Sequence, residues 1–306
     1  MTERLPNYGG QALIEGVMMR GARACAIAVR APDGVIRIQT EPLARIYSSR
    51  LAKIPFLRGL LVLWDALALG MRALTFSANV QAGDDSPIEG APMVLTMAAS
   101  LVMGLALFFL LPAGVGYLAE RLLQVTAWWS NVVEGVVRLG LLVGYIWAIG
   151  RIPEIRRVFG YHGAEHKTIN AFEAGAELTP ERVADFPAEH MRCGTAFLLT
   201  VVLFSILLFS ALGPLPLATR LVSRVLLVPL LAALAYEYIR LTGRMASHGW
   251  ARALAGPNLA LQRLTTREPE RGMIEVAIAA FGAMREHETR ADQAAADPPP
   301  APVNPG

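Results

Sequence analysis

The sequence predicts a mainly α-helical, polytopic membrane protein with about four spans, a small N-terminal β-hairpin region and cytoplasmic helical segments. Of the 306 residues, 54% are hydrophobic and 17% are charged, whereas soluble globular chains have about 45–50% apolar and about 25% charged residues. The apolar residues also gather in runs of about 20 or more, the length that a bilayer core requires. A net charge of +3 gives no support for a nucleic-acid partner.

The N-terminal region, residues 1–53, is predicted to be cytoplasmic and to contain a β-hairpin. Pro32, Asp33 and Gly34 form a turn signal between two short stretches of alternating apolar residues. Those apolar residues are Ile27, Val29, Ile36 and Ile38. The chain start has neither an apolar core nor a small-residue cleavage site, so no secretory signal is expected.

Residues 54–80 are predicted to form an amphipathic helix with a narrow polar stripe. Arg58, Asp65 and Arg72 recur every seven positions and therefore lie on one helical face. Such a helix can lie in the membrane interface or pack among spanning helices. We favour the interface, because a fifth span would break the agreement between charge and topology described below.

Four apolar runs are predicted to cross the membrane as two pairs of helices. The first pair occupies residues 92–150 and the second occupies residues 194–239. The individual runs are residues 92–119, 130–150, 194–213 and 215–239. The second run contains Glu134 and Arg138, which are four positions apart and can pair on one helical face.

The distribution of positive charge predicts that both termini are cytoplasmic. Lys and Arg number ten in residues 1–91, six in 151–193 and eight after 239. The short connections 120–129 and 214–219 hold one and none. By the positive-inside rule the three rich segments face the cytoplasm, which fits four spans.

Beyond the last run, residues 240–287 are predicted to form cytoplasmic helices and residues 288–306 a disordered tail. Apolar side chains recur there at helical spacing. They are Ile274, Ala277, Ile278 and Phe281. From about Glu288 the chain is dominated by Ala, Asp and Pro, a composition that does not support a packed core.

Three of the five histidines fall in the connection 151–193, together with Cys193. Within YHGAEHKTINAFEAG, His162 and His166 are four positions apart, so on a helix both imidazoles can reach one metal ion. The order H-x-x-E-H is that of the inverzincins, in which the glutamate polarises a metal-bound water. The sequence therefore predicts two metal ligands, with Glu165 as the catalytic base.

Further ligands are expected from HMRCG, where His190 and Cys193 are three positions apart. Imidazole and thiolate together favour zinc, although another divalent metal is compatible with them. The segment Leu178 to Glu181 predicts a short helix that folds this piece back toward the histidine pair. Glu237 is a candidate additional ligand or a partner of a ligand. Cys193 has a second interpretation as a small buried side chain, and Cys25 is expected in the core.

Four separated motifs occur along the chain in one order. They are YGGQALIEGVMMRG, YHGAEHKTINAFEAG, HMRCGTAFLL and QRLTTREPE. Together they resemble an uncharacterised bacterial membrane family, the domain of unknown function 1385, over about Tyr8 to Phe281. The resemblance implies a multi-pass protein of the bacterial inner (cytoplasmic) membrane. Because members are often labelled metal-dependent enzymes, it also implies a metal site.

The resemblance further assigns a set of N-terminal residues to a family motif. They are Tyr8, Gly9, Gly10, Gln11, Glu15, Gly16, Met18, Met19 and Arg20. It implies that the N-terminal hairpin region covers the metal face, with Glu15 as a candidate partner of the site. Members commonly have proline where this chain has Met191.

The sequence leaves more than one function class open. The first hypothesis is a membrane-anchored zinc hydrolase at the cytoplasmic membrane surface, acting on a membrane-associated peptide or a lipid headgroup. The alternative is a structural zinc site, closed by all four ligands, in a non-enzymatic scaffold that docks a partner. Three protein ligands and an open position would favour the enzyme, whereas four would favour the scaffold. A transporter built on Glu134 and Arg138 is the third class.

Overall fold

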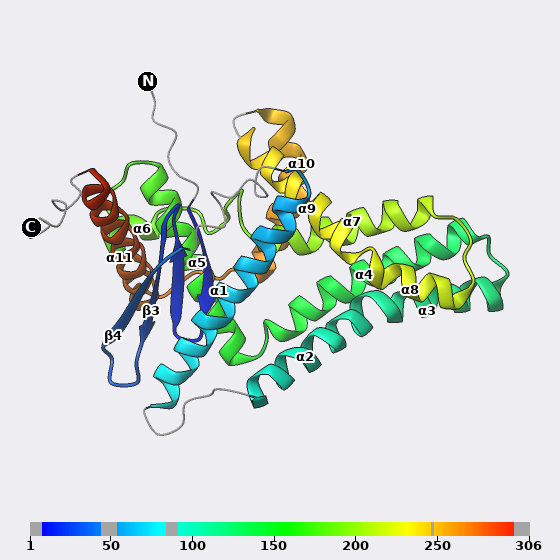
Figure 1. Ribbon diagram of the computed structural model, residues 1–306, viewed down its shortest axis with the longest axis horizontal. Coiled ribbons are helices and arrows are strands. Elements are labelled where there is room, and N and C mark those ends of the chain that lie inside the picture. The colour runs from blue at the N-terminus through cyan, green and yellow to red at the C-terminus, as the bar shows by residue number, and fades with distance from the viewer. Residues whose placement is uncertain (1–7, 44–53, 84–90, 246–247, 297–306) are drawn as a thin grey trace, which may run out of the picture.

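The computed structural model describes residues 8–43, 54–83, 91–245 and 248–296. Within these ranges the protein is mainly helical, with one small antiparallel sheet near the N-terminus. The sheet and the helices around it form one end of the molecule, and a bundle of apolar helices extends from it to the other end (Figure 1).

The sheet has four strands in the order β1-β2-β3-β4, each antiparallel to the next. The strands are β1 (Gly9–Leu13), β2 (Gly16–Arg20), β3 (Ala24–Arg30) and β4 (Ile36–Pro42). The predicted hairpin is confirmed as β3–β4, in which Arg30 pairs with Ile36 across a turn that places Gly34 at φ 85°. The prediction was incomplete, because the glycine-rich segment before it supplies two further strands.

Both faces of β2 and β3 are buried, which explains why the sequence pattern there was hard to recognise. On one face, Val17, Met19, Ala26 and Ala28 pack against helices α5 and α11. On the other face, Met18, Cys25, Ile27 and Val29 pack against helix α1. A strand that is covered on both sides has no alternation of apolar and polar residues.

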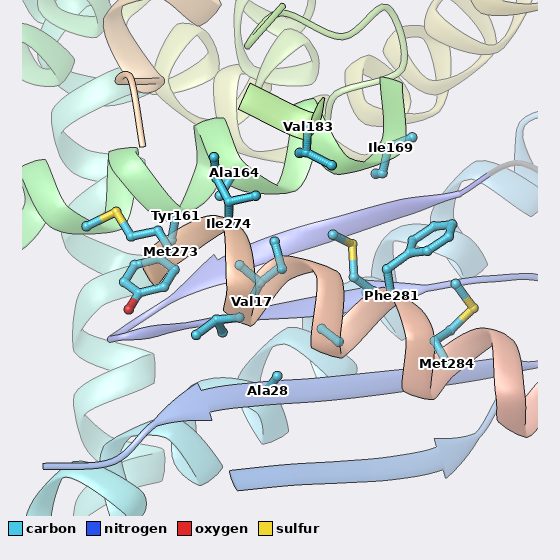
Figure 2. Packing of buried hydrophobic residues seen from close by; sticks show 14 of the residues in the cluster. Val17, Ala28, Tyr161, Ala164, Ile169, Val183, Met273, Ile274, Phe281 and Met284 are labelled. Atoms are coloured by element: carbon cyan, nitrogen blue, oxygen red, sulfur yellow. The ribbon is translucent and has the colours of Figure 1, made fainter. Parts of the chain in front are cut away.

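Helix α5 (Pro153–Glu173) and helix α11 (Arg271–Ala296) cover the first face of the sheet. Figure 2 shows Tyr161, Ala164 and Ile169 of α5 packed together with Ile274 and Phe281 of α11 over the strands. This core fixes α5 against the sheet. The histidine motif is therefore held by the same packing that stabilises the N-terminal region.

Helix α1 (Leu57–Ala82) lies along the second face of the sheet, with its polar stripe turned toward the protein. Asp65 pairs with Arg20 of β2, and Arg72 pairs with Glu41 of β4. Trp64, which is 73% exposed, lies on the outward side. The helix is long and apolar enough to cross a membrane, but its second half is committed to contacts with the sheet.

The bundle consists of the helices predicted as membrane spans. The elements are α2 (Ala91–Leu105), a π-helical stretch η3 (Ala106–Leu110), α3 (Leu111–Leu123), α4 (Ala127–Ile149), α7 (Thr195–Ala211), α8 (Leu217–Leu226) and α9 (Val228–Arg244). Among the described residues, three helical stretches are long and apolar enough to cross a membrane: α1, the stretch Leu95–Leu123 formed by α2, η3 and α3, and α4. The bent pair α8–α9 is a fourth if it counts as one span.

Two predicted spans differ from continuous 20-residue helices. Helix α7 has 17 residues, which is short for a bilayer core. The run 215–239 is broken between α8 and α9 by a 44° bend. Pro229 stands at the start of α9, where a residue without an N–H cannot continue the hydrogen-bond ladder of the preceding helix.

The remaining helices lie in the segments outside the apolar runs for which helices were predicted. Helix α6 (Pro180–Ala184) begins in the segment where a short helix was predicted, and the Thr179 side chain before it accepts a hydrogen bond from the Arg182 N–H. Helix α10 (Gly249–Thr265) leads through a short connection to α11. Helix α11 runs to Ala296, so it extends into the segment for which a tail was predicted. Residues 297–306 lie outside the described residues.

Candidate metal centre

Helix α5 presents His162, Glu165 and His166 at the junction between the apolar bundle and the sheet. It starts at Pro153, with three residues between it and the end of α4, and its second half is almost entirely buried. The sheet covers one side of it. On another side the connection after α10 approaches closely, with the Arg267 N–H donating to the Phe159 carbonyl at 2.9 Å. The motif is therefore enclosed by segments that are far apart in the sequence.

Two backbone carbonyls determine which ring nitrogen each histidine presents. His162 Nδ1 lies 2.8 Å from the Thr265 carbonyl, and His166 Nδ1 lies 2.5 Å from the Ala188 carbonyl. Because a carbonyl only accepts, both Nδ1 atoms carry the proton and both Nε2 atoms are left with a free lone pair. Burial lowers the pKa of His166, which keeps that imidazole neutral. This is the arrangement in which histidines bind metals.

Cys193 completes a group of three possible ligand atoms. Its Sγ lies 3.2 Å from His162 Nε2. One candidate ligand atom from each of His162, His166 and Cys193 lies within 4.8 Å of the others. His166 Nε2 is buried and has no hydrogen-bond partner in the described part of the chain. The unpartnered nitrogen of His166 and the contacting pair of His162 Nε2 and Cys193 Sγ together form a set of donor atoms suited to a metal ion.

The spacing of these atoms fits zinc. A tetrahedral zinc ion with Zn–N of about 2.0–2.1 Å and Zn–S of about 2.3 Å separates its nitrogen and sulfur ligands by about 3.5 Å. The observed 3.2 Å between His162 Nε2 and Cys193 Sγ is close to that value. All three ligand atoms lie within 4.8 Å of one another, so they would have to approach more closely to share one ion. The donor set of two imidazoles and one thiolate is also one that zinc accepts.

Glu165 lies beside this group but is not one of its members. The Gly10 N–H of β1 donates a hydrogen bond to its carboxylate, while Oε2 is buried without a partner among the described residues. Burial raises the pKa of Glu165 to about 7, and the nearby His162 and the Gly10 hydrogen bond partly oppose this rise. A buried carboxylate with one free oxygen is suited to take up and release a proton near neutral pH.

His190 is close to the group but turned away from it. Its ring centroid is 5.7 Å from that of His166, and its Nε2 lies 3.6 Å from a Glu173 carboxylate oxygen. Gln262 of α10 holds its backbone through hydrogen bonds to both the His190 N–H and the carbonyl. The structure thus brings three of the four predicted ligands together and pairs the fourth with Glu173.

The two predicted partner residues, Glu237 and Glu15, have ion pairs of their own. Glu237 of α9 pairs with Arg58 of α1 and is absent from the metal-ligand group. Glu15 accepts hydrogen bonds from Arg157 at 2.5 and 2.7 Å and from the Tyr161 hydroxyl at 3.1 Å. Because Tyr161 precedes His162, Glu15 holds the start of the motif against the turn between β1 and β2.

Sequence reasoning did not identify Thr265, Gln262 or Gly163 as parts of the site. Thr265 and Gln262 belong to the QRLTTREPE motif, to which the sequence alone assigned no role. Gly163 lies between the two histidine-bearing turns, and a Cβ there would stand 2.1 Å from the Arg267 carbonyl oxygen. Position 163 therefore requires glycine, because the connection after α10 passes directly over helix α5 there.

Comparison with known proteins agrees with the resemblance seen in the motifs. Residues 54–287 match a family described as protein of unknown function (DUF1385). The chain is also 33% identical over 305 residues to the uncharacterized protein YqhQ of Bacillus subtilis strain 168, covering 94% of this chain and 95% of that protein. This chain belongs to the DUF1385 family. No solved structure matches it.

The DUF1385 match includes all three members of the ligand group and both residues of α10 that orient histidines. The N-terminal motif lies before the matched residues, and the structure places it against α5 through Gly10 and Glu15. The expectation that the N-terminal region covers the histidine motif therefore agrees with the packing.

Proposed function

We propose that this protein is a membrane-anchored, metal-dependent enzyme, a zinc hydrolase acting at the cytoplasmic surface of the bacterial inner membrane. The observation that carries the proposal is the convergence of three ligand atoms beside a carboxylate that is not a ligand. The Nε2 atoms of His162 and His166 lie near Cys193 Sγ, and Glu165 keeps one oxygen without a partner among the described residues. Three protein ligands leave a coordination position open, which is the pattern of catalytic zinc sites.

The chain's own residues supply the proton chemistry of the proposed reaction. When bound, zinc supplies Lewis-acid activation of water and of the scissile carbonyl or phosphoryl group. Glu165 takes the proton of the attacking water on Oε2 and returns it to the leaving group. The Gly10 N–H holds the other oxygen and orients the carboxylate. Thr265 and Ala188 keep the imidazoles in the tautomer that binds metal.

The membrane placement is supported by aromatic residues at both ends of α4. Trp128 and Trp129 are exposed at its start, and Trp147 is exposed near its end. Trp147 comes 19 positions after Trp128, a rise of about 28 Å, close to the roughly 30 Å hydrocarbon thickness of a bilayer. Tryptophan is enriched at both membrane interfaces. The metal group follows just beyond the Trp147 end.

A bilayer surface also suits the position of α1. Hydrogen bonds and ion pairs join this helix to the sheet from Asp65 to Gln81. The sheet shares its core with α5, so the sheet, α5 and most of α1 must be on the same side of the membrane. We therefore place α1 along the cytoplasmic surface, with its outward apolar side toward lipid.

The alternative is a structural zinc site in a non-enzymatic scaffold or partner-docking protein. It requires His190 as a fourth ligand, because a closed tetrahedral site has no open position. The contact between His190 and Glu173 opposes this arrangement. The number of protein ligands thus separates the two functions.

Zinc content and zinc K-edge absorption spectroscopy of the purified full-length protein test the proposal. We expect about one zinc per chain, with two nitrogen ligands and one sulfur ligand from protein and one further light-atom ligand. His166→Ala should remove the metal. Glu165→Gln should keep the metal and abolish hydrolysis of membrane-associated peptides or phospholipids, since it removes the proton acceptor.

Two matched histidine variants serve as controls. His248→Ala changes a histidine outside the group and should leave the zinc content unchanged. His190→Ala should leave the absorption spectrum unchanged, because His190 is paired with Glu173. A spectrum that loses a nitrogen ligand in His190→Ala would establish the closed scaffold site instead. Full activity in Glu165→Gln would exclude its role as the base.

A further inference from the structure

An open cavity of about 510 Å³ lies at the end of α4, one side of it formed by the first turns of α5. Its lining residues are Gly150, Arg151, Arg156 and Arg267. Three of these four are arginines, and they come from three separate places in the chain: the end of α4, the first turn of α5 and the connection after α10. The tertiary fold, not a run of basic sequence, concentrates positive charge here.

The three guanidinium groups have no acidic partner among the described residues. Arg151 lies over the Trp147 ring at 3.8 Å, while the side chains of Arg156 and Arg267 make no hydrogen bond or ion pair within the described chain. Most other described arginines of this protein are paired, as Arg157 is with Glu15 and Arg192 with Glu173. Three exposed, unpaired arginines around one concavity point to an anionic ligand.

The position of the cavity along the normal of the proposed bilayer indicates which class of anion binds there. Trp147 marks the interfacial end of α4, and Arg151 follows it by one helical turn. The cavity is therefore at the level of the phospholipid headgroups on the cytoplasmic side. The amino-terminal end of α5, which begins at Pro153, adds the positive end of a helix dipole at the same level.

We propose that Arg151, Arg156 and Arg267 form a binding site for the phosphate of an anionic phospholipid headgroup. Guanidinium groups bind phosphate oxygens in pairs, so three of them can hold one phosphodiester from several sides. The inference requires the membrane placement proposed above but none of the metal chemistry. The site lies next to the metal group through Arg267, whose backbone passes over Gly163. A lipid held there is a candidate substrate or a fixed anchor for the site.

Native mass spectrometry of the full-length protein in detergent tests the site. Phosphatidylglycerol and phosphatidylcholine with the same acyl chains are the probes. We expect preferential retention of one phosphatidylglycerol. Basic side chains near an anionic surface contribute about fivefold each to affinity, so the triple variant Arg151→Gln, Arg156→Gln and Arg267→Gln should bind this lipid at least tenfold more weakly.

The control variant removes the same charge from elsewhere. Arg37, Arg182 and Arg290 are exposed and lie on the sheet, α6 and α11. Their triple change to Gln should alter binding by less than twofold. Replacing the three cavity arginines by Lys keeps the charge but removes the paired hydrogen bonds, and should give an intermediate affinity. His166→Ala should bind the lipid normally, which separates this proposal from the zinc proposal.

Each other outcome overturns the proposal. Wild-type affinity in the cavity variant, or an equal loss in the control variant, would show that no site exists there. Displacement of the lipid by millimolar inorganic phosphate, with phosphate itself retained, would assign the cavity to a soluble anion. Because all six arginines are exposed, unchanged melting temperature and zinc content should accompany every arginine variant, and these measurements show that folding is intact.

Discussion

At the scale of single residues, main-chain groups rather than side chains organise the candidate metal centre. The carbonyls of Thr265 and Ala188 set the tautomers of His162 and His166, and the Gly10 N–H holds Glu165. Main-chain donors and acceptors are fixed by the fold, so the fold itself orients the side chains proposed as ligands. The site is consequently sensitive to backbone position more than to the identity of the residues that supply those groups.

The ion pair between Glu15 and Arg157 leads to a pH-dependent prediction. The hydrogen bonds from Arg157 hold the pKa of Glu15 below its ordinary value in the folded protein, against the opposing effect of burial. The unfolded chain therefore binds more protons at acid pH, and the stabilisation present above about pH 4.5 is lost as the pH falls through the folded-state pKa. Because Arg157 is about half exposed, the contribution is below about 1 kcal/mol.

Glu15→Gln should therefore lower the melting temperature at pH 7, and the difference from wild type should shrink toward pH 3. Differential scanning fluorimetry at both pH values measures this. Asp33→Asn serves as a comparison, since Asp33 is exposed and its ion pair with Arg37 joins neighbouring surface residues. A melting difference for Glu15→Gln that is equal at both pH values would contradict the assigned pKa shift.

At the scale of elements, α5 is a helix packed on two sides whose glycines permit close approach. Its sheet-facing side carries Tyr161, Ala164 and Ile169, and Gly163 lies under the Arg267 carbonyl. The connection after α10 reaches the histidines only because this position lacks a side chain. The close approach of the connection after α10 to α5 therefore depends on one glycine in the histidine motif.

Gly163→Ala should destabilise the protein by about 1–3 kcal/mol, because its Cβ would overlap a backbone oxygen that cannot move alone. It should also weaken zinc binding by shifting Thr265. Gly282→Ala in α11 is the matched control: its Cβ meets nothing within 4 Å, so the better helix propensity should stabilise by about 0.5–1 kcal/mol. Chemical denaturation and zinc analysis measure both. Equal effects of the two changes would exclude the close approach.

Within the bundle, Glu134 joins α4 to α8 through a buried charge cluster. The predicted pair with Arg138 is confirmed at 2.7 Å, and Arg220 and Arg224 of α8 also bind the same carboxylate. Arg138 further donates to the Phe108 carbonyl in the π-helical stretch η3. The four charged side chains of the cluster are each at most 3% exposed. The cluster attaches α8, the first half of the bent pair α8–α9, to α4 in the bundle.

Glu134→Gln should destabilise the bundle by about 3–5 kcal/mol, because it leaves buried arginines without their common counter-ion. Glu120→Gln is the control, since Glu120 contacts Arg220 alone and is 32% exposed; its effect should be much smaller. Melting in detergent measures the loss, and zinc content should be unchanged while the protein is folded. Normal stability with activity lost would instead indicate a transport role for the cluster.

At the scale of the whole molecule, the sheet with its covering helices forms one end and the apolar helical bundle extends to the other (Figure 1). The connection between α3 and α4 and that between α7 and α8 are at the end of the bundle far from the sheet (Figure 1). The sheet, α5 and α11 form the other end around one core. A bilayer across the bundle leaves the metal group and the arginine cavity at one membrane surface. The proposed site and its proposed substrate class are thus brought to the same plane.

Cysteine labelling tests this arrangement. With a membrane-impermeant maleimide on intact cells, Gln124→Cys and Pro214→Cys should react, whereas Asp33→Cys and Glu177→Cys should react only after permeabilisation. The native cysteines give little background, since Cys25 and Cys193 are buried and burial raises the pKa of Cys25 to about 11. Labelling of Asp33→Cys but not Glu177→Cys in intact cells would contradict the shared core of the sheet and α5.

The sequence by itself determined the helical class, the apolar runs and the histidine pair, because each depends on local spacing. Hydropathy over about 20 residues predicted where the bundle helices lie, and an interval of four placed His162 and His166 on one face. The cap at Thr179 and the turn at Gly34 were also local signals. The chain's two missed strands lacked such a signal, since burial on both faces removes alternation.

Only the tertiary structure decided which predicted ligands meet. His190 and Cys193 were equal candidates by spacing, but Glu173 and Gln262 turn the first away while the second joins the histidine pair. The arginine cavity is likewise assembled from three distant segments. Contacts between such segments depend on how the helices pack in space. Local sequence spacing does not report which distant residues the packing brings together. Local chemistry was therefore readable in advance, whereas the composition of each site was not.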